Sequence, residues 1–207
     1  MSTDLIFYTN PMSRGRIVRW MLEEVGAPYD TQLLEYGTTM KAPEYLAINP
    51  MGKVPAIRHG DAVVTECAAI CAYLADAFPG AELAPPADQR GAYYRWMFFG
   101  AGPLEAAVLN RSLGFEVSSE QEMTAGYGNF DRVLDTLESA VAGGGYVAGE
   151  RFSAADVYIG SQIGWGMEFG TIAPRPAFEA YFEQLASRPA RQRAAELDDA
   201  AGAPVSA

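Results

Sequence analysis

The residues best suited to chemistry begin with a short polar segment between Tyr8 and Arg16. It contains Ser13 followed by two arginines, and no acidic residue occurs between Leu5 and Leu22. If a helix begins here, its unpaired N–H groups and the positive end of its dipole favour an anion or a thiolate. Ser13 could donate a hydrogen bond to that group or could only cap the helix, and pattern alone favours capping.

A second segment with chemical potential is Asn49–Ile57, in which Pro55 opens an apolar run. Proline cannot donate to a strand ladder, so it marks an edge or an irregular position. If the Val54–Pro55 peptide bond is cis, the N–H and C=O of Val54 turn outward, where they could pair with an extended, peptide-like ligand. An edge-strand proline with no ligand explains the same residues.

A third segment, Thr65–Ile70, runs from an apolar stretch into a helix start and carries Glu66 and Cys67. Free N–H groups at a helix start can hold a carboxylate, and Glu66 can hold an ammonium group. The segment therefore suits the head group of an amino acid. A first-turn acid that complements the helix dipole is the simpler alternative.

Composition limits the classes of protein that fit. The chain has 207 residues, 49% hydrophobic and 20% charged, which is typical of a soluble globular protein. A net charge of −11 argues against nucleic-acid binding, and the presence of one histidine argues against a multi-histidine metal site. We see no signal peptide and no apolar run near the ~20 residues of a membrane span. We therefore expect a cytoplasmic protein with no metal, no nucleic-acid partner and no membrane association.

The hydrophobic pattern changes near residue 80, which predicts two domains. Residues 1–80 are expected to form an α/β domain with the element order βαβ and then αββα. A proline-rich linker is expected at 81–87, followed by an all-helical domain at 88–207. The expected strands are 5–8, 31–34, 54–58 and 62–65, and the expected helices are 14–25, 42–48, 66–78 and 88–113. Capping boxes are expected at Ser119–Glu122, opening a helix toward Val141, and at Ser153–Asp156.

The three segments, in this order and spacing and together with Ser153–Asp156, resemble the glutathione transferase superfamily, most closely its soluble bacterial members. The resemblance covers nearly the whole chain. It implies a thioredoxin-like N-terminal domain that binds glutathione, followed by an all-helical C-terminal domain. It also implies a homodimer.

The resemblance assigns roles within the first domain. Val54, before a cis Pro55, would bond the cysteinyl backbone of glutathione, while Glu66 and Cys67 would hold its γ-glutamyl group. Lys53, and less surely Lys41, would face the anionic end of the tripeptide, although surface solubility also explains both lysines. Cys67 stands where the family usually has serine, and a thiol donates hydrogen bonds poorly. This exchange implies weaker binding, or a mixed disulfide with the tripeptide.

The catalytic group of the family lies near the end of the first strand. Ser13 fits the serine or cysteine position and is preferred, because it lies at the expected helix start. Tyr8 is the alternative, because it is followed by an Arg14-Gly15-Arg16 run that looks somewhat like the tyrosine type. In either case the hydroxyl would stabilise the glutathione thiolate, which is the nucleophile.

The activity implied is that of a glutathione S-transferase, which adds the thiolate to a small hydrophobic electrophile in detoxification. Aromatic and thioether side chains of the second domain would line the electrophile pocket, although helix-bundle core explains each one singly; the candidates are Trp96, Met97, Phe99 and Trp165. Three alternatives stay open: a non-catalytic glutathione-binding or interaction protein, a glutathione-dependent isomerase, and a thiol reductase that uses Cys67.

Overall fold

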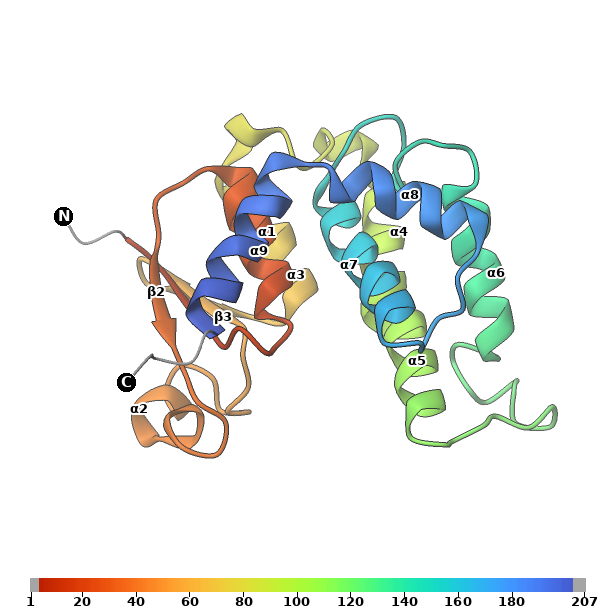
Figure 1. Ribbon diagram of the computed structural model, residues 1–207, viewed down its shortest axis with the longest axis horizontal. Helices are drawn as coiled ribbons and strands as arrows, with labels where there is room; N and C mark the ends of the chain where they lie inside the picture. The colour runs from red at the N-terminus through yellow and green to blue at the C-terminus, as the bar shows by residue number, and fades with distance from the viewer. Residues whose placement is uncertain (1–3, 203–207) are drawn as a thin grey trace. The chain divides into compact units, whose positions relative to one another are not determined.

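The computed structural model describes residues 4–202. The chain divides into two compact units, and most of their elements are labelled in Figure 1. The first unit contains the residues up to Leu83 and those from Arg188 onward, and the second contains Ala84–Ser187. The boundary between Leu83 and Ala84 falls inside the stretch that the sequence marks as a linker.

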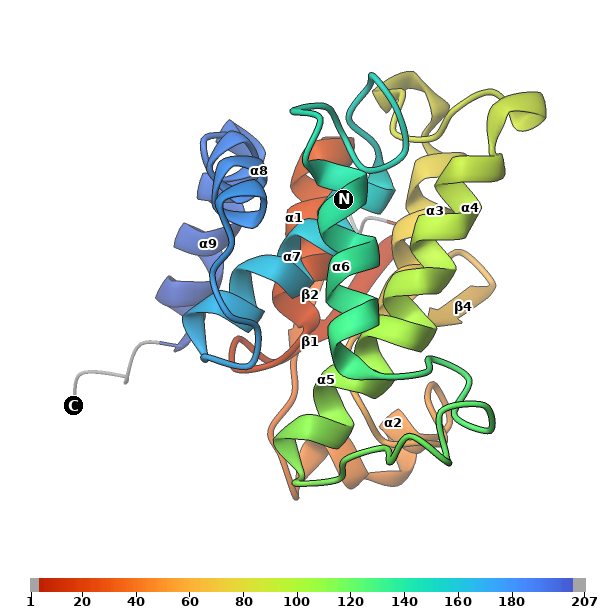
Figure 2. The same ribbon diagram turned by 90° about the vertical axis from the view of Figure 1, so that its right-hand side faces the viewer.

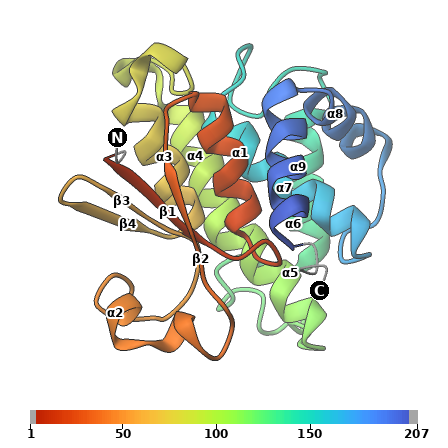
Figure 3. The ribbon, with the colours of Figure 1, turned by 60° about the vertical axis from the view of Figure 1, so that its left-hand side comes forward.

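The first unit has the expected element order, a small sheet with helices, to which the last helix of the chain is added. Its elements are β1 (Leu5–Thr9), α1 (Gly15–Val25), β2 (Asp30–Leu33), α2 (Pro43–Leu46), β3 (Ala56–His59), β4 (Ala62–Thr65), α3 (Cys67–Ala77) and α9 (Pro189–Gly202). The strand order is β2-β1-β3-β4 (Figure 3). Strand β1 pairs parallel with β2 and antiparallel with β3, and β3 pairs antiparallel with β4.

Side chains along β1 point alternately to the two faces of the sheet, so the last residues of the strand lie on different faces. Phe7 and Thr9 are fully buried, and the Arg19 guanidinium of α1 lies 5.1 Å from the centre of the Phe7 ring. Tyr8 points to the opposite face, where it packs against a cluster that contains Met40 and Tyr45. The face toward α1 therefore carries Thr9, and the face toward α2 carries Tyr8.

Helix α9 departs from the expectation of one helical region over residues 88–207, because it belongs to the first unit and packs against α1. Figure 3 shows the two helices alongside each other. The physical reason is charge pairing. Arg19 and Asp198 form an ion pair at 2.7 Å with side chains only 5% and 1% exposed, and Arg188 holds Glu24 through two bonds of 2.6 and 2.7 Å. A buried charge needs such a partner, so α9 is fixed where its carboxylate meets Arg19.

The second unit is helical (Figure 2). Its main elements are α4 (Gly91–Phe99), a π-helical turn (Gly100–Leu104), α5 (Glu105–Ser112), α6 (Phe130–Val141), α7 (Ala154–Glu168) and α8 (Pro176–Ala186).

The expected helix start at Ser119 is wrong, since α6 begins at Phe130 and is capped by Asn129, whose side chain accepts from the Arg132 N–H at 2.9 Å. The Ser118 N–H does bond the Gln121 side chain, but only a turn forms before Gly128, which has a φ of 72°.

The second expected capping box is present at the start of α7. Asp156 is fully buried and accepts from the N–H groups of Val147 and Ser153 and from the Tyr181 hydroxyl, at 2.7, 2.9 and 2.7 Å. Burial raises the pKa of this carboxyl, and these hydrogen bonds pull it in the opposite direction. One side chain thus holds the loop before α7, the start of α7, and α8 together.

Replacing Asp156 with alanine is expected to lower the free energy of unfolding by about 3 kcal/mol, because several buried donors lose their acceptor. Urea denaturation measures the loss. Ser139→Ala is the control, because Ser139 is exposed and bonds only the Thr136 carbonyl of its own helix. A loss of under about 1 kcal/mol for Asp156→Ala would contradict the central role of this carboxylate.

Candidate functional site

The loop between β1 and α1 places Ser13 just before the helix, which begins at Gly15. The Ser13 Oγ accepts from the Gly15 N–H at 2.9 Å and donates to the Asn10 carbonyl at 2.6 Å. The Asn10 side chain in turn donates to the Leu34 carbonyl at 2.8 Å and accepts from the Met12 N–H at 2.9 Å. Ser13 therefore bonds the first N–H of the helix, but the N-cap position is Arg14, which has no side-chain cap, so Ser13 is not the N-cap residue. Its hydroxyl lies in an ordered turn.

The first turn of α1 satisfies more of its own N–H groups than the sequence suggests. Besides Gly15, the N–H of Arg16 bonds the Ser13 carbonyl at 3.2 Å and that of Ile17 bonds the Arg14 carbonyl at 3.1 Å. The free N–H groups that we expected here are thus largely used. The hydroxyl of Ser13 is the group of this segment that could turn toward a ligand.

Gly15 is required by a close approach of β1 to α1. A Cβ at this position would lie 1.9 Å from Thr9 Oγ1 and 3.0 Å from Ser13 Oγ. Thr9 is fully buried, and its hydroxyl has no hydrogen-bond partner among residues 4–202. The missing side chain therefore allows the strand end and the serine loop to meet.

The second segment has the expected cis peptide bond between Val54 and Pro55. Two hydrogen bonds fix the residue before Val54: the Lys53 carbonyl accepts from the Tyr45 hydroxyl and, at 2.8 Å, from the Asn49 side chain. Burial raises the pKa of Tyr45 to about 12, so its hydroxyl stays a donor at neutral pH. Within the described part of the chain, the main chain of Val54 has no hydrogen-bond partner, which leaves it open to pair with a ligand.

The two lysines differ in what they touch. The Lys41 ammonium donates to the carbonyls of Met51 and Gly52 at 3.3 and 2.7 Å, so it closes the loop that carries the second segment. The side chain of Lys53 is exposed beside Val54. Lys53 is therefore the better placed of the two to meet an anionic group of a ligand.

The third segment has a strained backbone at Glu66, whose φ of 68° and ψ of 121° are rare for a residue with a side chain. Glu66 is exposed, and no side chain caps α3, the helix that follows. Such strain is often retained at functional sites, because the surrounding structure must compensate for it. The geometry leaves a carboxylate and an uncapped helix start next to each other.

Cys67 connects the third segment to the first. It is half-buried at the start of α3, and its thiol donates to the Arg14 carbonyl at 3.6 Å, one residue after Ser13. Cys71 is fully buried, and burial raises the pKa of its thiol well above the ordinary value. Cys67 is thus the accessible cysteine, and Cys71 belongs to the core.

Tyr8 lies away from the serine loop. Its ring packs 5.6 Å from that of Tyr45, centre to centre, on the face of the sheet opposite α1. The structure therefore groups Ser13, rather than Tyr8, with the start of α1 and with Cys67.

The candidates for a second-substrate pocket all belong to the second unit. Trp96 and Met97 are 5% and 4% exposed, which places them in the core, the alternative that the sequence left open. Phe99 and Trp165 are half-buried. On the same helix as Phe99, Tyr94 and Phe98 are exposed. Of the four candidates, the two half-buried ones have surface to offer a ligand.

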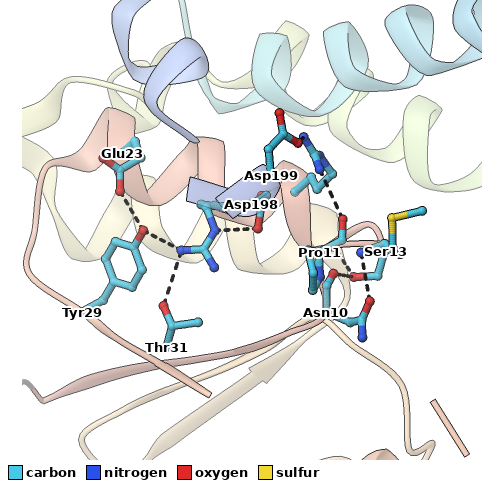
Figure 4. Close-up of polar contacts among 12 residues, drawn as sticks. Asn10, Pro11, Ser13, Glu23, Tyr29, Thr31, Asp198 and Asp199 are labelled. Atoms are coloured by element: carbon cyan, nitrogen blue, oxygen red, sulfur yellow. Dashed lines mark hydrogen bonds and ion pairs between the residues drawn. The ribbon is translucent and has the colours of Figure 1, made fainter. Parts of the chain in front are cut away.

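Sequence reasoning missed several residues that shape the site. Tyr36 donates from its hydroxyl to the Met12 carbonyl at 3.2 Å. Arg16 donates to the Pro11 carbonyl at 3.4 Å and pairs with Asp199 at 2.6 Å; Figure 4 shows Pro11 and Asp199. The pairing of residues 183 positions apart has no signal in one sequence. For Tyr36 the only signal is its place between the first two segments.

Residues 4–202 contain neither a metal-binding cluster nor a membrane-spanning helix. No group of three or more His, Cys, Asp or Glu side chains in this range could hold a metal ion. No helix in the range has the length and apolar character needed to cross a membrane.

Comparison with known proteins identifies both parts of the chain. Residues 12–77 match the family model of the glutathione S-transferase N-terminal domain, and residues 120–165 match that of the C-terminal domain. Glutathione S-transferase 3 of Zea mays is 28% identical over 204 residues, or 91% of this chain and 92% of the relative. Glutathione S-transferase F13 of Arabidopsis thaliana is 30% identical over 164 residues, or 72% and 75%. Elongation factor 1-gamma of Prunus avium is 28% identical over 167 residues, or 75% of this chain and 39% of the relative.

Solved structures agree with these matches. The glutathione transferase of Methylococcus capsulatus superposes with a TM-score of 0.78 at 28% identity, covering 95% of this chain and 99% of that one. A glutathione transferase homologue from Sulfitobacter with bound glutathione gives 0.74 at 28% identity, covering 97% and 99%. The matches extend over both units, and they include the segments that carry Ser13, cis-Pro55 and Glu66. The chain belongs to the glutathione transferase superfamily.

Proposed function

We propose that the protein is an enzyme that binds glutathione in its first unit and adds the glutathione thiolate to a small hydrophobic electrophile. The observation that carries the proposal is the contact of Cys67 with the Arg14 carbonyl, which brings the serine loop and the start of α3 together. The solved relatives that contain glutathione, such as the Sulfitobacter homologue, support the same ligand.

The chemistry of the tripeptide fits the groups available in this unit. The unpaired main chain of Val54 suits the peptide backbone of the cysteinyl residue. The uncapped start of α3 suits the γ-glutamyl carboxylate, and the Glu66 carboxylate suits the ammonium group of the same residue. Lys53 suits the anionic glycyl end. A ligand with these charges in this order complements the site along its length.

Activation of the thiol requires a donor and a positive field. A free thiol has a pKa of about 8.5, so only a few per cent is thiolate at neutral pH. The Ser13 hydroxyl, turned from the Asn10 carbonyl toward the sulfur, would stabilise the thiolate, and the start of α1 would add its dipole. With an aryl halide, the sulfur forms a bond to carbon, the halide leaves with the electron pair of the carbon–halogen bond, and the thiol proton passes to solvent.

A non-catalytic glutathione-binding protein is the second candidate. The observation in its favour is the bond from Ser13 to the Asn10 carbonyl at 2.6 Å, which occupies the hydrogen that a thiolate needs. The similarity to elongation factor 1-gamma covers 75% of this chain, so the family match is not confined to proteins named as transferases. Tight glutathione binding without turnover on a broad panel of electrophiles would favour this candidate. The homodimer, the cytoplasmic location, the role in detoxification and the electrophile pocket remain predictions.

Replacing Ser13 with alanine is expected to raise the pKa of the bound glutathione thiol by about one unit, which corresponds to roughly tenfold in the thiolate equilibrium. The rate of glutathione conjugation to an aryl halide at pH 6.5 should fall by a similar factor. Thiolate absorbance and steady-state kinetics measure the two effects. Tyr8→Phe is the control and should leave both near the wild-type value; a loss confined to Tyr8→Phe would assign the catalytic role to Tyr8.

Replacing Cys67 with serine is expected to lower the dissociation constant of glutathione several-fold, because a hydroxyl donates a hydrogen bond better than a thiol does. Calorimetric titration compares this variant with Cys67→Ala, which offers no donor and should bind no more tightly than the wild type. Equal affinity in all three proteins would show that the side chain at position 67 does not touch the ligand. If the wild type has thiol-reductase activity and Cys67→Ala has the same activity, the alternative of a thiol reductase that uses Cys67 is excluded.

A further inference from the structure

We infer that Asp199 and Arg16 are positioning residues, which hold the serine loop through the Pro11 carbonyl so that the Ser13 hydroxyl meets the glutathione sulfur. The inference rests on the proposed function. It assigns to the last helix of the chain a part in thiol activation that it exerts without touching the ligand.

The contact path is short and direct. The Arg16 guanidinium donates to one carboxylate oxygen of Asp199 at 2.6 Å and to the Pro11 carbonyl at 3.4 Å. Pro11 lies between Asn10, whose carbonyl accepts from Ser13, and the serine itself. Figure 4 shows Asp199, Pro11, Asn10 and Ser13 in sequence along this path. At the end of α9, Gly202 also approaches Pro11, since a Cβ there would lie 3.5 Å from the proline ring.

The neighbouring ion pair fixes where Asp199 can be. Arg16 and Arg19 are three residues apart on α1 and therefore lie on one face of that helix. Arg19 meets Asp198 in the buried pair, and its guanidinium also reaches the hydroxyls of Tyr29 and Thr31 at 3.2 and 3.4 Å. Because this pair is shielded from water, it sets the register of α9 on α1. Asp199 then necessarily falls beside Arg16.

The charged residues of α1 are unfavourably placed for an isolated helix and are stabilised by their partners on α9. Arginines in the first half of α1 and glutamates in its second half each oppose the dipole of their own helix. Across the interface they find opposite charges, since Glu23 pairs with Arg193 at 2.7 Å at the far end from the serine loop. That distant pair resembles the Arg16–Asp199 pair in exposure, with side chains of Arg193 and Asp199 that are 67% and 69% exposed. It differs in having no contact with the loop.

This resemblance supplies a matched control. Exposed ion pairs contribute little to stability, so Asp199→Asn and Arg193→Gln should lower the unfolding temperature by similarly small amounts. Asp199→Asn alone should raise the pKa of the bound glutathione thiol, by about half a unit, and lower the conjugation rate at pH 6.5 about threefold. Arg16→Gln should act alike, and the double variant should add little, because the two residues act through one contact.

The sign of the pKa shift separates positioning from simple electrostatics. Asp199→Asn removes a negative charge, and a long-range field effect would therefore lower the thiol pKa, whereas a displaced serine raises it. A lowered or unchanged thiol pKa in Asp199→Asn would overturn the inference, as would an equal rise in Arg193→Gln.

Hydrogen exchange tests the same inference without glutathione. The Gly15 N–H, which bonds Ser13 Oγ, should exchange faster in Asp199→Asn than in the wild type, and its exchange should be unchanged in Arg193→Gln.

If the full-length wild type does not lower the thiol pKa of glutathione at all, the proposed function fails. The exchange of residues 10–16 then still decides whether Asp199 holds the loop: unchanged exchange in Asp199→Asn overturns the inference, and faster exchange supports its positioning part.

Discussion

The contact between Thr9 and Gly15 is the constraint on which the rest of the site depends. The end of β1 and the start of α1 can touch only because Gly15 has no side chain, since a Cβ would lie 1.9 Å from the Thr9 hydroxyl. This contact makes the connection between β1 and α1 a tight turn. Ser13 lies at the end of this turn, two residues before the first residue of α1. The Arg14 carbonyl then comes within reach of Cys67 at 3.6 Å, so the start of α3 is drawn to the same place. With a wider turn, the Arg14 carbonyl would no longer lie within reach of the Cys67 thiol.

Much of the first unit could be predicted from the sequence because its signals are local. Apolar alternation, glycine and proline positions and the order of short elements predict the sheet and its helices, and the observed order agrees. The cis bond at Pro55 and the capping box at Ser153 were also expected, and both are present. The capping box is decided by residues that are near neighbours in the chain, whereas the cis bond was implied only by the family resemblance.

The features that escaped prediction depend on distant residues or on competing local choices. The place of α9 depends on pairs such as Arg19 with Asp198, which are 179 positions apart. The sequence did not reveal that the Lys41 ammonium bonds the carbonyls of Met51 and Gly52, which are 10 and 11 positions away. At Ser119 a cap-like pattern yields only turns, since Gly126 and Gly128 follow before a helix can extend. Periodicity cannot reveal which of several polar partners a side chain meets.

The return of α9 to the first unit has a consequence for how the molecule is made. On a ribosome, the sheet and α1 emerge before α9, because Asp198, the partner of the Arg19 guanidinium, lies 179 positions further along the chain. Until α9 is made, Arg19 lacks its carboxylate partner and the face of α1 that α9 covers is exposed. The first unit therefore cannot reach its final packing before that point. The second unit, which is continuous in the chain, can consolidate first. Residues that are translated earlier thus reach their final packing only when α9 has been made.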